Sequence, residues 1–104
     1  MAPPRPAPLR PAIRKNPKPL THVRVLIVED VRTVAAAVQA VLFQAGMDVE
    51  LAETGAEAMD RKDSFRPDIA LIDLGLPDVE GFELVERFAA AGDCGIILLT
   101  ANDE

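Results

Sequence analysis

Three short apolar runs, each ending in an oxygen-bearing side chain, constrain the fold of this chain most strongly. The runs are residues 23–28, followed by Glu29 and Asp30; residues 69–72, followed by Asp73; and residues 95–99, followed by Thr100. Short runs rich in Val, Ile and Leu are typical of buried strands in a parallel sheet. Ligands bind at the carboxyl ends of strands in open α/β sheets. The pattern therefore predicts one shared site, with Asp73 as a candidate phosphate acceptor and Glu29, Asp30 and Asp73 as a candidate Mg²⁺ site.

Helical patterns separate the predicted strands. A first helix is expected from about residue 31 to residue 45, and Gly46 stands where a helix end favours a left-handed backbone. The predicted inward face of this helix consists of Val34, Val38, Val41 or Leu42, and Ala45. Residues 47–51 then alternate between apolar and acidic side chains, which predicts a half-buried edge strand.

Two further helices complete the alternation. Thr54, with Glu57 three residues later, forms a capping-box pattern that opens a short helix, and Pro67 precedes a strand at residues 68–73. A third helix is expected at about residues 80–91, before the last strand at residues 95–100. Its predicted inward side chains are Phe82, Val85, Phe88 and Ala89. Strands separated by helices predict an α/β fold, a doubly wound parallel sheet with helices on both faces.

Charge divides the chain into two parts. The 104 residues suffice for one domain. Residues 1–21 hold seven of the nine prolines and five basic residues with no acidic one, which predicts a disordered, Pro/Arg-rich tail. Such a tail could bind an acidic surface, serve as a Pro-rich ligand, or be a solvated leader. Residues 22–104 carry six basic against 17 acidic residues, which argues against nucleic-acid binding by the domain itself.

The remaining composition bounds the class of protein. The single cysteine, Cys94, rules out an intrachain disulfide, and we interpret it as a small buried hydrophobic side chain. No apolar run reaches the about 18 residues that a membrane span needs, and the first residues lack the apolar segment of a signal peptide. Asp78, Glu80, Asp103 and Glu104 are interpreted as surface charges, and His22 as structural or solvent-exposed.

Taken together, these motifs resemble the receiver domain of two-component response regulators. The resemblance rests on residues 25–30, on Asp73 with the Leu-Pro-Asp-Val-Glu-Gly sequence at 76–81, and on residues 98–101. It covers residues 22–104, essentially the whole chain after the tail. It implies a flavodoxin-like sheet of strand order 2-1-3-4, as in members of this family.

The resemblance also implies the chemistry of the site. Asp73 corresponds to the phosphoacceptor, which takes a phosphoryl group from the phosphohistidine of a histidine kinase or phosphotransfer protein. Asp30 corresponds to a direct Mg²⁺ ligand, Glu29 to its acidic neighbour acting largely through metal-bound water, and Gly75 to a ligand through its backbone carbonyl. Two carboxylates about 4 Å apart repel by about 4 kcal/mol at an effective dielectric constant of 20, and a cation relieves this repulsion.

Thr100 corresponds to the switch hydroxyl that turns toward the phosphoryl group, and the Ala101 amide to a further contact. On this basis we expect a cytoplasmic signalling switch, not a turnover enzyme; it would assist only its own phosphoryl transfer and dephosphorylation. We expect no contact with a membrane.

The chain departs from the family at its carboxyl end. Relative to the roughly 120 residues of a receiver, the fourth helix, fifth strand and fifth helix are missing, and the receiver at 22–104 is therefore expected to be incomplete. In the family, the missing segment carries a lysine that pairs with the acceptor. No residue of this chain can be assigned to that role. The strand at 95–100 would then present an apolar edge, so we expect either a fragment or a sheet completed by dimerisation through this strand.

Two other functions remain as alternatives. A pseudo-receiver that never carries phosphate and serves as a docking or dimerisation module is favoured by the missing lysine. An aspartyl-phosphate hydrolase of the haloacid-dehalogenase type needs a second acid two residues beyond a nucleophile on the first strand. Asp30 is followed instead by Val31 and Arg32, which disfavours this enzyme class.

Overall fold

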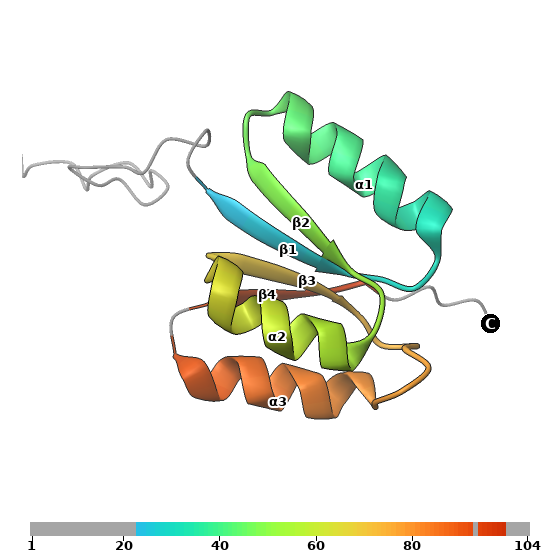
Figure 1. The fold of residues 1–104 in the computed structure, drawn as a ribbon, viewed down its shortest axis with the longest axis vertical. Helices are drawn as coiled ribbons and strands as arrows, with labels where there is room; N and C mark the ends of the chain where they lie inside the picture. Colours follow the sequence, from blue (N-terminus) through green and yellow to red (C-terminus); the bar gives the residue numbers. More distant parts are fainter. Residues whose placement is uncertain (1–22, 93, 100–104) are drawn as a thin grey trace, which may run out of the picture.

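The computed structural model of the protein describes residues 23–92 and 94–99. Within them, seven elements alternate along the chain. They are β1 (Arg24–Val28), α1 (Arg32–Gln44), β2 (Asp48–Ala52), α2 (Gly55–Phe65), β3 (Ile69–Asp73), α3 (Gly81–Ala91) and β4 (Gly95–Leu99). All the strand pairs are parallel and the sheet has the order β2-β1-β3-β4 (Figure 1). The predicted doubly wound sheet and its strand order are confirmed, while the predicted tail lies outside the described residues.

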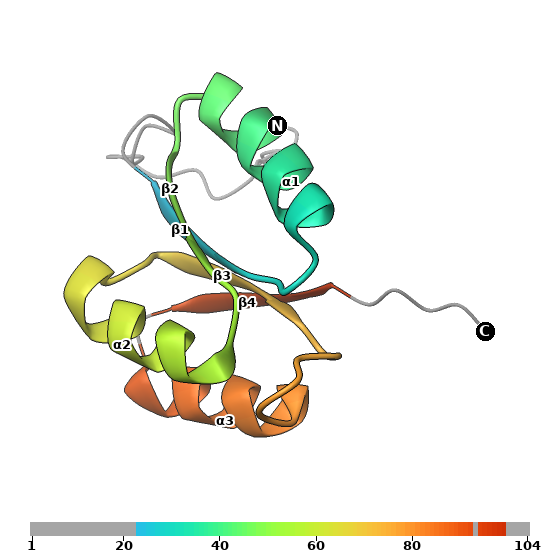
Figure 2. The same ribbon diagram turned by 45° about the vertical axis from the view of Figure 1, so that its right-hand side comes forward.

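The sheet is covered by helices on both faces, with α1 on one side and α2 and α3 on the other (Figures 1 and 2). Alternate strand residues therefore supply two apolar layers. The layer under α2 and α3 includes Leu26, Val28, Ala70 and Ile72 with Leu84 and Phe88, all at most 1% exposed. The layer under α1 includes Val25, Ile27 and Leu71 with Ala35. Burial of these aliphatic side chains holds the strands in one register.

The register brings the carboxyl ends of the two central strands level with each other. Val28 of β1 lies beside Ile72 of β3 on one side and beside Ala52 of β2 on the other. The residue that follows β1, Glu29, therefore emerges next to Asp73, the last residue of β3. This juxtaposition is the consequence of the fold that matters for the site.

Local signals at two helix ends behave as predicted. The backbone N–H of Glu57 donates to Thr54 Oγ1 at 3.1 Å, and Glu57 Oε1 in turn accepts from the backbone N–H of Glu53 at 2.8 Å. The reciprocal pair resembles a capping box, although the second donor is the residue before the cap. Gly46 follows α1 with φ of 92°, and its N–H donates to the Phe43 carbonyl.

The predicted inward face of α1 is only half correct. Val38 and Leu42 pack against the core as expected, together with buried Ala35. Of the alternatives Val41 and Leu42, Val41 is 67% exposed. Val34 is 43% exposed and Ala45 is also exposed, so the predicted burial of these two is wrong. Ala35 and Leu42 each follow one of these valines by one residue, and one residue turns the side chain by about 100°. The apolar stripe of α1 is therefore wider than the part of it that the sheet covers.

The predicted face of α3 needs a similar correction. Phe88 is buried and Val85 is half-buried, as expected, but Phe82 is 57% exposed and Ala89 is also exposed. Leu84, which the prediction omitted, lies four residues before Phe88 and shares its inward stripe. Gly81 sets the helix against the preceding chain, since a Cβ there would lie 2.5 Å from Leu74 Cα.

Candidate metal and phosphoryl site

Three carboxylates converge at the carboxyl ends of β1 and β3. Each of Glu29, Asp30 and Asp73 offers one oxygen atom, and these three atoms all lie within 4.8 Å of one another. We call these residues the acidic cluster. Glu29 is only 6% exposed, whereas Asp30 and Asp73 are half-buried and open to solvent. The structure thus brings together the three acidic side chains that the sequence placed at strand ends.

Burial and the closeness of the other two carboxylates raise the pKa of Glu29, the most buried of the three. Burial is the main cause that raises the pKa of Glu29, and the nearby carboxylates of Asp73 and Asp30 raise it further. One contact opposes the shift, because the backbone N–H of Val31 donates to Glu29 Oε2 at 3.1 Å. A buried carboxyl beside two others favours either a proton or a cation as its partner.

The donor set fits a hard divalent cation. Magnesium prefers oxygen ligands, takes one or two carboxylates and retains several waters. The three carboxylates supply such oxygen ligands: Glu29 is buried, while Asp30 and Asp73 reach solvent and leave room for water. The orientation of Asp73 is assisted by its own loop, since the Gly75 backbone N–H donates to Asp73 Oδ1 at 3.1 Å. Coordination by the Gly75 carbonyl stays a prediction, and Thr100 and Ala101 lie outside the described residues.

Asp78, predicted from the sequence as a surface charge, also makes a tertiary contact near the site. Asp78 is exposed, as the prediction of a surface charge requires, but its carboxylate accepts two backbone hydrogen bonds from α2. Gly55 N–H donates to Asp78 Oδ1 at 2.8 Å and Ala56 N–H donates to Oδ2 at 3.1 Å. These bonds lower the pKa of Asp78. The partners are more than twenty residues apart in the chain, so no local pattern announces the contact.

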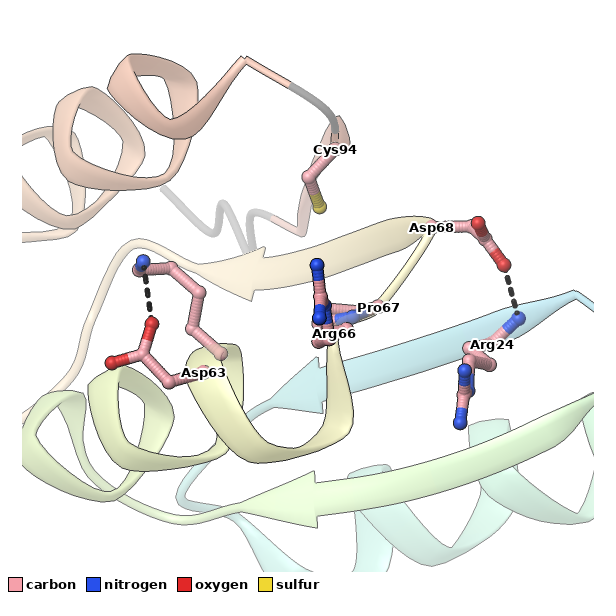
Figure 3. A pocket seen from close by; sticks show the side chains of 7 residues that line it. Arg24, Asp63, Arg66, Pro67, Asp68 and Cys94 are labelled. Carbon is pink, nitrogen blue, oxygen red and sulfur yellow. Dashed lines mark hydrogen bonds and ion pairs between the residues drawn. The ribbon is translucent and has the colours of Figure 1, made fainter.

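A separate pocket of about 600 Å³ lies at the opposite end of the strands (Figure 3). Asp68 and Cys94, which directly precede β3 and β4, line it together with Arg24, Lys62, Asp63, Arg66 and Pro67. The Cys94 thiol is half-buried against the core, and burial raises its pKa. The expectation of a small hydrophobic side chain is thus met in packing, though burial is partial.

Comparison with known proteins agrees with the fold. The family model described as the response regulator receiver domain matches residues 25–104. The chain therefore belongs to the receiver domains of two-component response regulators, which are signalling modules. None of the helices in the described part of the chain is long and apolar enough to cross a membrane.

Similarity to individual proteins is moderate and covers most of this chain. Response regulator MprA of Mycobacterium tuberculosis is 39% identical over 82 residues, which are 78% of this chain and 36% of MprA. The chain thus spans about a third of the length of this curated relative. A CheY-like receiver domain from Methanospirillum hungatei has a TM-score of 0.74 at 30% identity, covering 79% of this chain and 66% of that one. Response regulator TrrA of Thermotoga maritima, solved with Mg²⁺ and BeF, has a TM-score of 0.74 at 29% identity, with coverages of 79% and 72%.

Proposed function

We propose that Asp73 accepts a phosphoryl group from the phosphohistidine of a histidine kinase or phosphotransfer protein. The observation that carries this proposal is the convergence of Glu29, Asp30 and Asp73 within 4.8 Å at the carboxyl ends of β1 and β3. In the transfer, an Asp73 carboxylate oxygen forms a bond to phosphorus while the bond from phosphorus to the histidine nitrogen breaks. The leaving imidazole keeps the electron pair. An ionised carboxylate needs no general base for this attack.

We assign the ligands of a Mg²⁺ ion to Asp30, Asp73 and the Gly75 carbonyl, with Glu29 acting through bound water. When bound, the ion would neutralise the charge that gathers on the phosphoryl oxygens. The protein's part is to hold the carboxylates in place. Glu29 is fixed by burial and by the Val31 N–H, and Asp73 by the Gly75 N–H. We propose Thr100 as the switch hydroxyl that turns toward the phosphoryl group after phosphorylation. Phosphorylation by a histidine kinase or phosphotransfer protein implies a cytoplasmic location.

We also propose that a second copy of the chain pairs along the outer edge of β4. Among the described residues no strand covers this edge, and Ile97 and Leu98 are 51% and 39% exposed. Antiparallel pairing about Ile97 sets Ile96 beside Leu98 of the other copy, so apolar side chains meet on the same sheet face. Pairing with the β2 edge would instead bring Asp48 and Glu50 against apolar side chains. A strand of five residues buries little area, so we expect weak association.

The phosphoryl proposal is tested by a ¹⁵N–¹H correlation spectrum before and after adding Mg²⁺ with beryllofluoride, which mimics an acyl phosphate. We expect the amides of Asp30, Asp73 and Gly75 to shift, and Asp73→Asn to abolish the beryllofluoride response. A well-dispersed spectrum that ignores both additions would favour a pseudo-receiver that serves only as a docking module.

A further inference from the structure

The loop after the candidate acceptor is fastened to a helix that begins more than twenty residues earlier. This loop, residues 74–80, joins β3 to α3, and we call it the β3–α3 loop. Its Asp78 carboxylate accepts the N–H groups of Gly55 and Ala56, the first two residues of α2. Figure 1 shows the start of α2 beside this loop. A helix leaves its first N–H groups without partners in its own turns, so a carboxylate there is bound by two donors and by the helix dipole.

A second contact holds the same part of the loop against the same helix end. Val79 lies so close to Gly55 that a Cβ added at Gly55 would lie 2.1 Å from Val79 Cγ1. The side-chain-free Gly55 therefore lets the loop backbone and the helix approach. The hydrogen bonds that the Asp78 carboxylate accepts and the packing of Val79 together fix this end of the loop on α2.

The other end of the loop carries the backbone that faces the candidate acceptor. Gly75 is exposed; it donates its N–H to Asp73 Oδ1, and the only atoms that a Cβ added there would meet within 4 Å are the two Asp73 carboxylate oxygens. Leu76 is buried in the layer under α2 and α3 and anchors the middle of the loop. Gly75 is therefore a solvent-facing backbone unit whose position depends on anchors on either side of it.

We propose that Asp78 is a positioning residue, which holds the β3–α3 loop on α2 and thereby places the Gly75 backbone against the Asp73 carboxylate. The inference deepens the proposed function, on which its relevance to Mg²⁺ rests. Both hydrogen bonds that the Asp78 side chain accepts come from α2 and not from the acidic cluster. It acts through the loop backbone, and α2 becomes part of the scaffold of the site.

The competing explanation is that Asp78 only caps α2. Thr54 provides a matched control, because it accepts from the N–H of Glu57 at the same helix end and makes no hydrogen bond to the loop. Thr54→Ala removes a cap without releasing the loop, whereas Asp78→Ala removes a cap and releases it. Asp78→Asn keeps one oxygen acceptor for the Gly55 N–H and should behave between wild type and Asp78→Ala.

The first measurement uses the metal-free, full chain. We expect Asp78→Ala to shift the Gly75 amide resonance and to speed its hydrogen exchange, Asp78→Asn to do so less, and Thr54→Ala to leave Gly75 unchanged. The inference is overturned if Gly75 keeps its wild-type shift and exchange rate in Asp78→Ala. It is equally overturned if Thr54→Ala perturbs Gly75 as much as Asp78→Ala does.

The second measurement is a Mg²⁺ titration of the same three variants. Loss of a residue that orients a metal ligand typically weakens metal binding by tenfold or more, so we expect about a tenfold weaker affinity in Asp78→Ala and wild-type affinity in Thr54→Ala. Equal affinities in Asp78→Ala and wild type would contradict the positioning role. If wild type itself binds no Mg²⁺, the proposed function fails, while the Gly75 measurement still decides the role of Asp78.

Discussion

The carboxylates of Glu29 and Asp73 meet across the carboxyl ends of β1 and β3, with oxygen atoms within 4.8 Å of each other, and the negative charge of Asp73 helps to raise the pKa of Glu29. Two acidic side chains that share one site cannot both ionise without cost. The fold tolerates this electrostatic repulsion because the register of β1 and β3 places the two residues side by side. A cation would turn the repulsion into shared coordination, which is the physical basis for the first prediction.

Asp30→Asn should raise the melting temperature of the metal-free protein, because it removes one of three crowded negative charges. The same variant should lose most of the stabilisation that wild type gains from Mg²⁺, about 2.7 kcal/mol at a Mg²⁺ concentration of 100 times the dissociation constant. Thermal melts with and without Mg²⁺ measure both effects. Asp60→Asn, an exposed carboxylate on α2, is the control and should change neither value. A Mg²⁺ response retained in full by Asp30→Asn would contradict the ligand assignment.

Asp73→Asn should abolish covalent labelling by a small phosphodonor in the presence of Mg²⁺, because the amide lacks the nucleophilic carboxylate. Intact mass spectrometry before and after incubation measures the phosphorylated fraction. Asp68→Asn is the matched control, since it makes the same change at the amino end of β3, far from the acidic cluster. Labelling that persists in Asp73→Asn would show that another residue accepts the phosphoryl group.

Gly55→Ala should destabilise the fold by about 1–3 kcal/mol, because its Cβ would overlap the Val79 side chain. Denaturant unfolding measures the loss. The double variant Gly55→Ala with Val79→Ala should recover part of it, since truncating Val79 removes the atom in conflict. A double variant that is less stable than Gly55→Ala alone would argue that Val79 does not press on the helix.

Stability at acidic pH should depend on Asp78. Hydrogen bonds from Gly55 and Ala56 lower its pKa in the folded state, so the unfolded chain takes up the proton first as the pH falls. The stabilisation is complete above the unfolded pKa of about 3.9 and is lost as the pH falls through the lower, folded value. Asp78→Asn should lack this contribution, so its stability deficit relative to wild type should shrink on acidification below that range. Denaturant unfolding at a series of pH values tests this; a deficit that stays constant down to the lowest pH would contradict it.

Ile97→Lys should shift the chain toward monomer if two copies pair along β4, because a charge at the centre of the paired edge opposes the contact. Light scattering over a range of protein concentrations measures the association. Val41→Lys is the control, since it places the same charge on a side chain of α1 that is 67% exposed and lies away from β4. A wild-type chain that stays monomeric at every concentration would exclude the proposed pairing.

Much of the architecture follows from periodicity within short stretches of chain. Each strand was located within one residue because runs of Val, Ile and Leu between helical patterns leave few alternatives. The Thr54 cap and the left-handed Gly46 were predictable for the same reason, since each depends on neighbours within a few residues. Glu29, Asp30 and Asp73 were predictable as a cluster because parallel strands end at the same edge of the sheet.

Tertiary structure decided what lies between elements. Val34 and Phe82 belong to apolar stripes in the sequence but are exposed, because the width of a stripe does not reveal how much of it a sheet covers. The contact of Asp78 with Gly55 joins segments that the chain separates widely, and no residue near either one encodes it. The sequence alone thus determined the elements and the strand-end carboxylates, since these depend on local spacing. Packing in three dimensions determined which helix faces are exposed, the contact of Asp78 with α2, and the raised pKa of Glu29. Each of these depends on atoms that only the fold brings together.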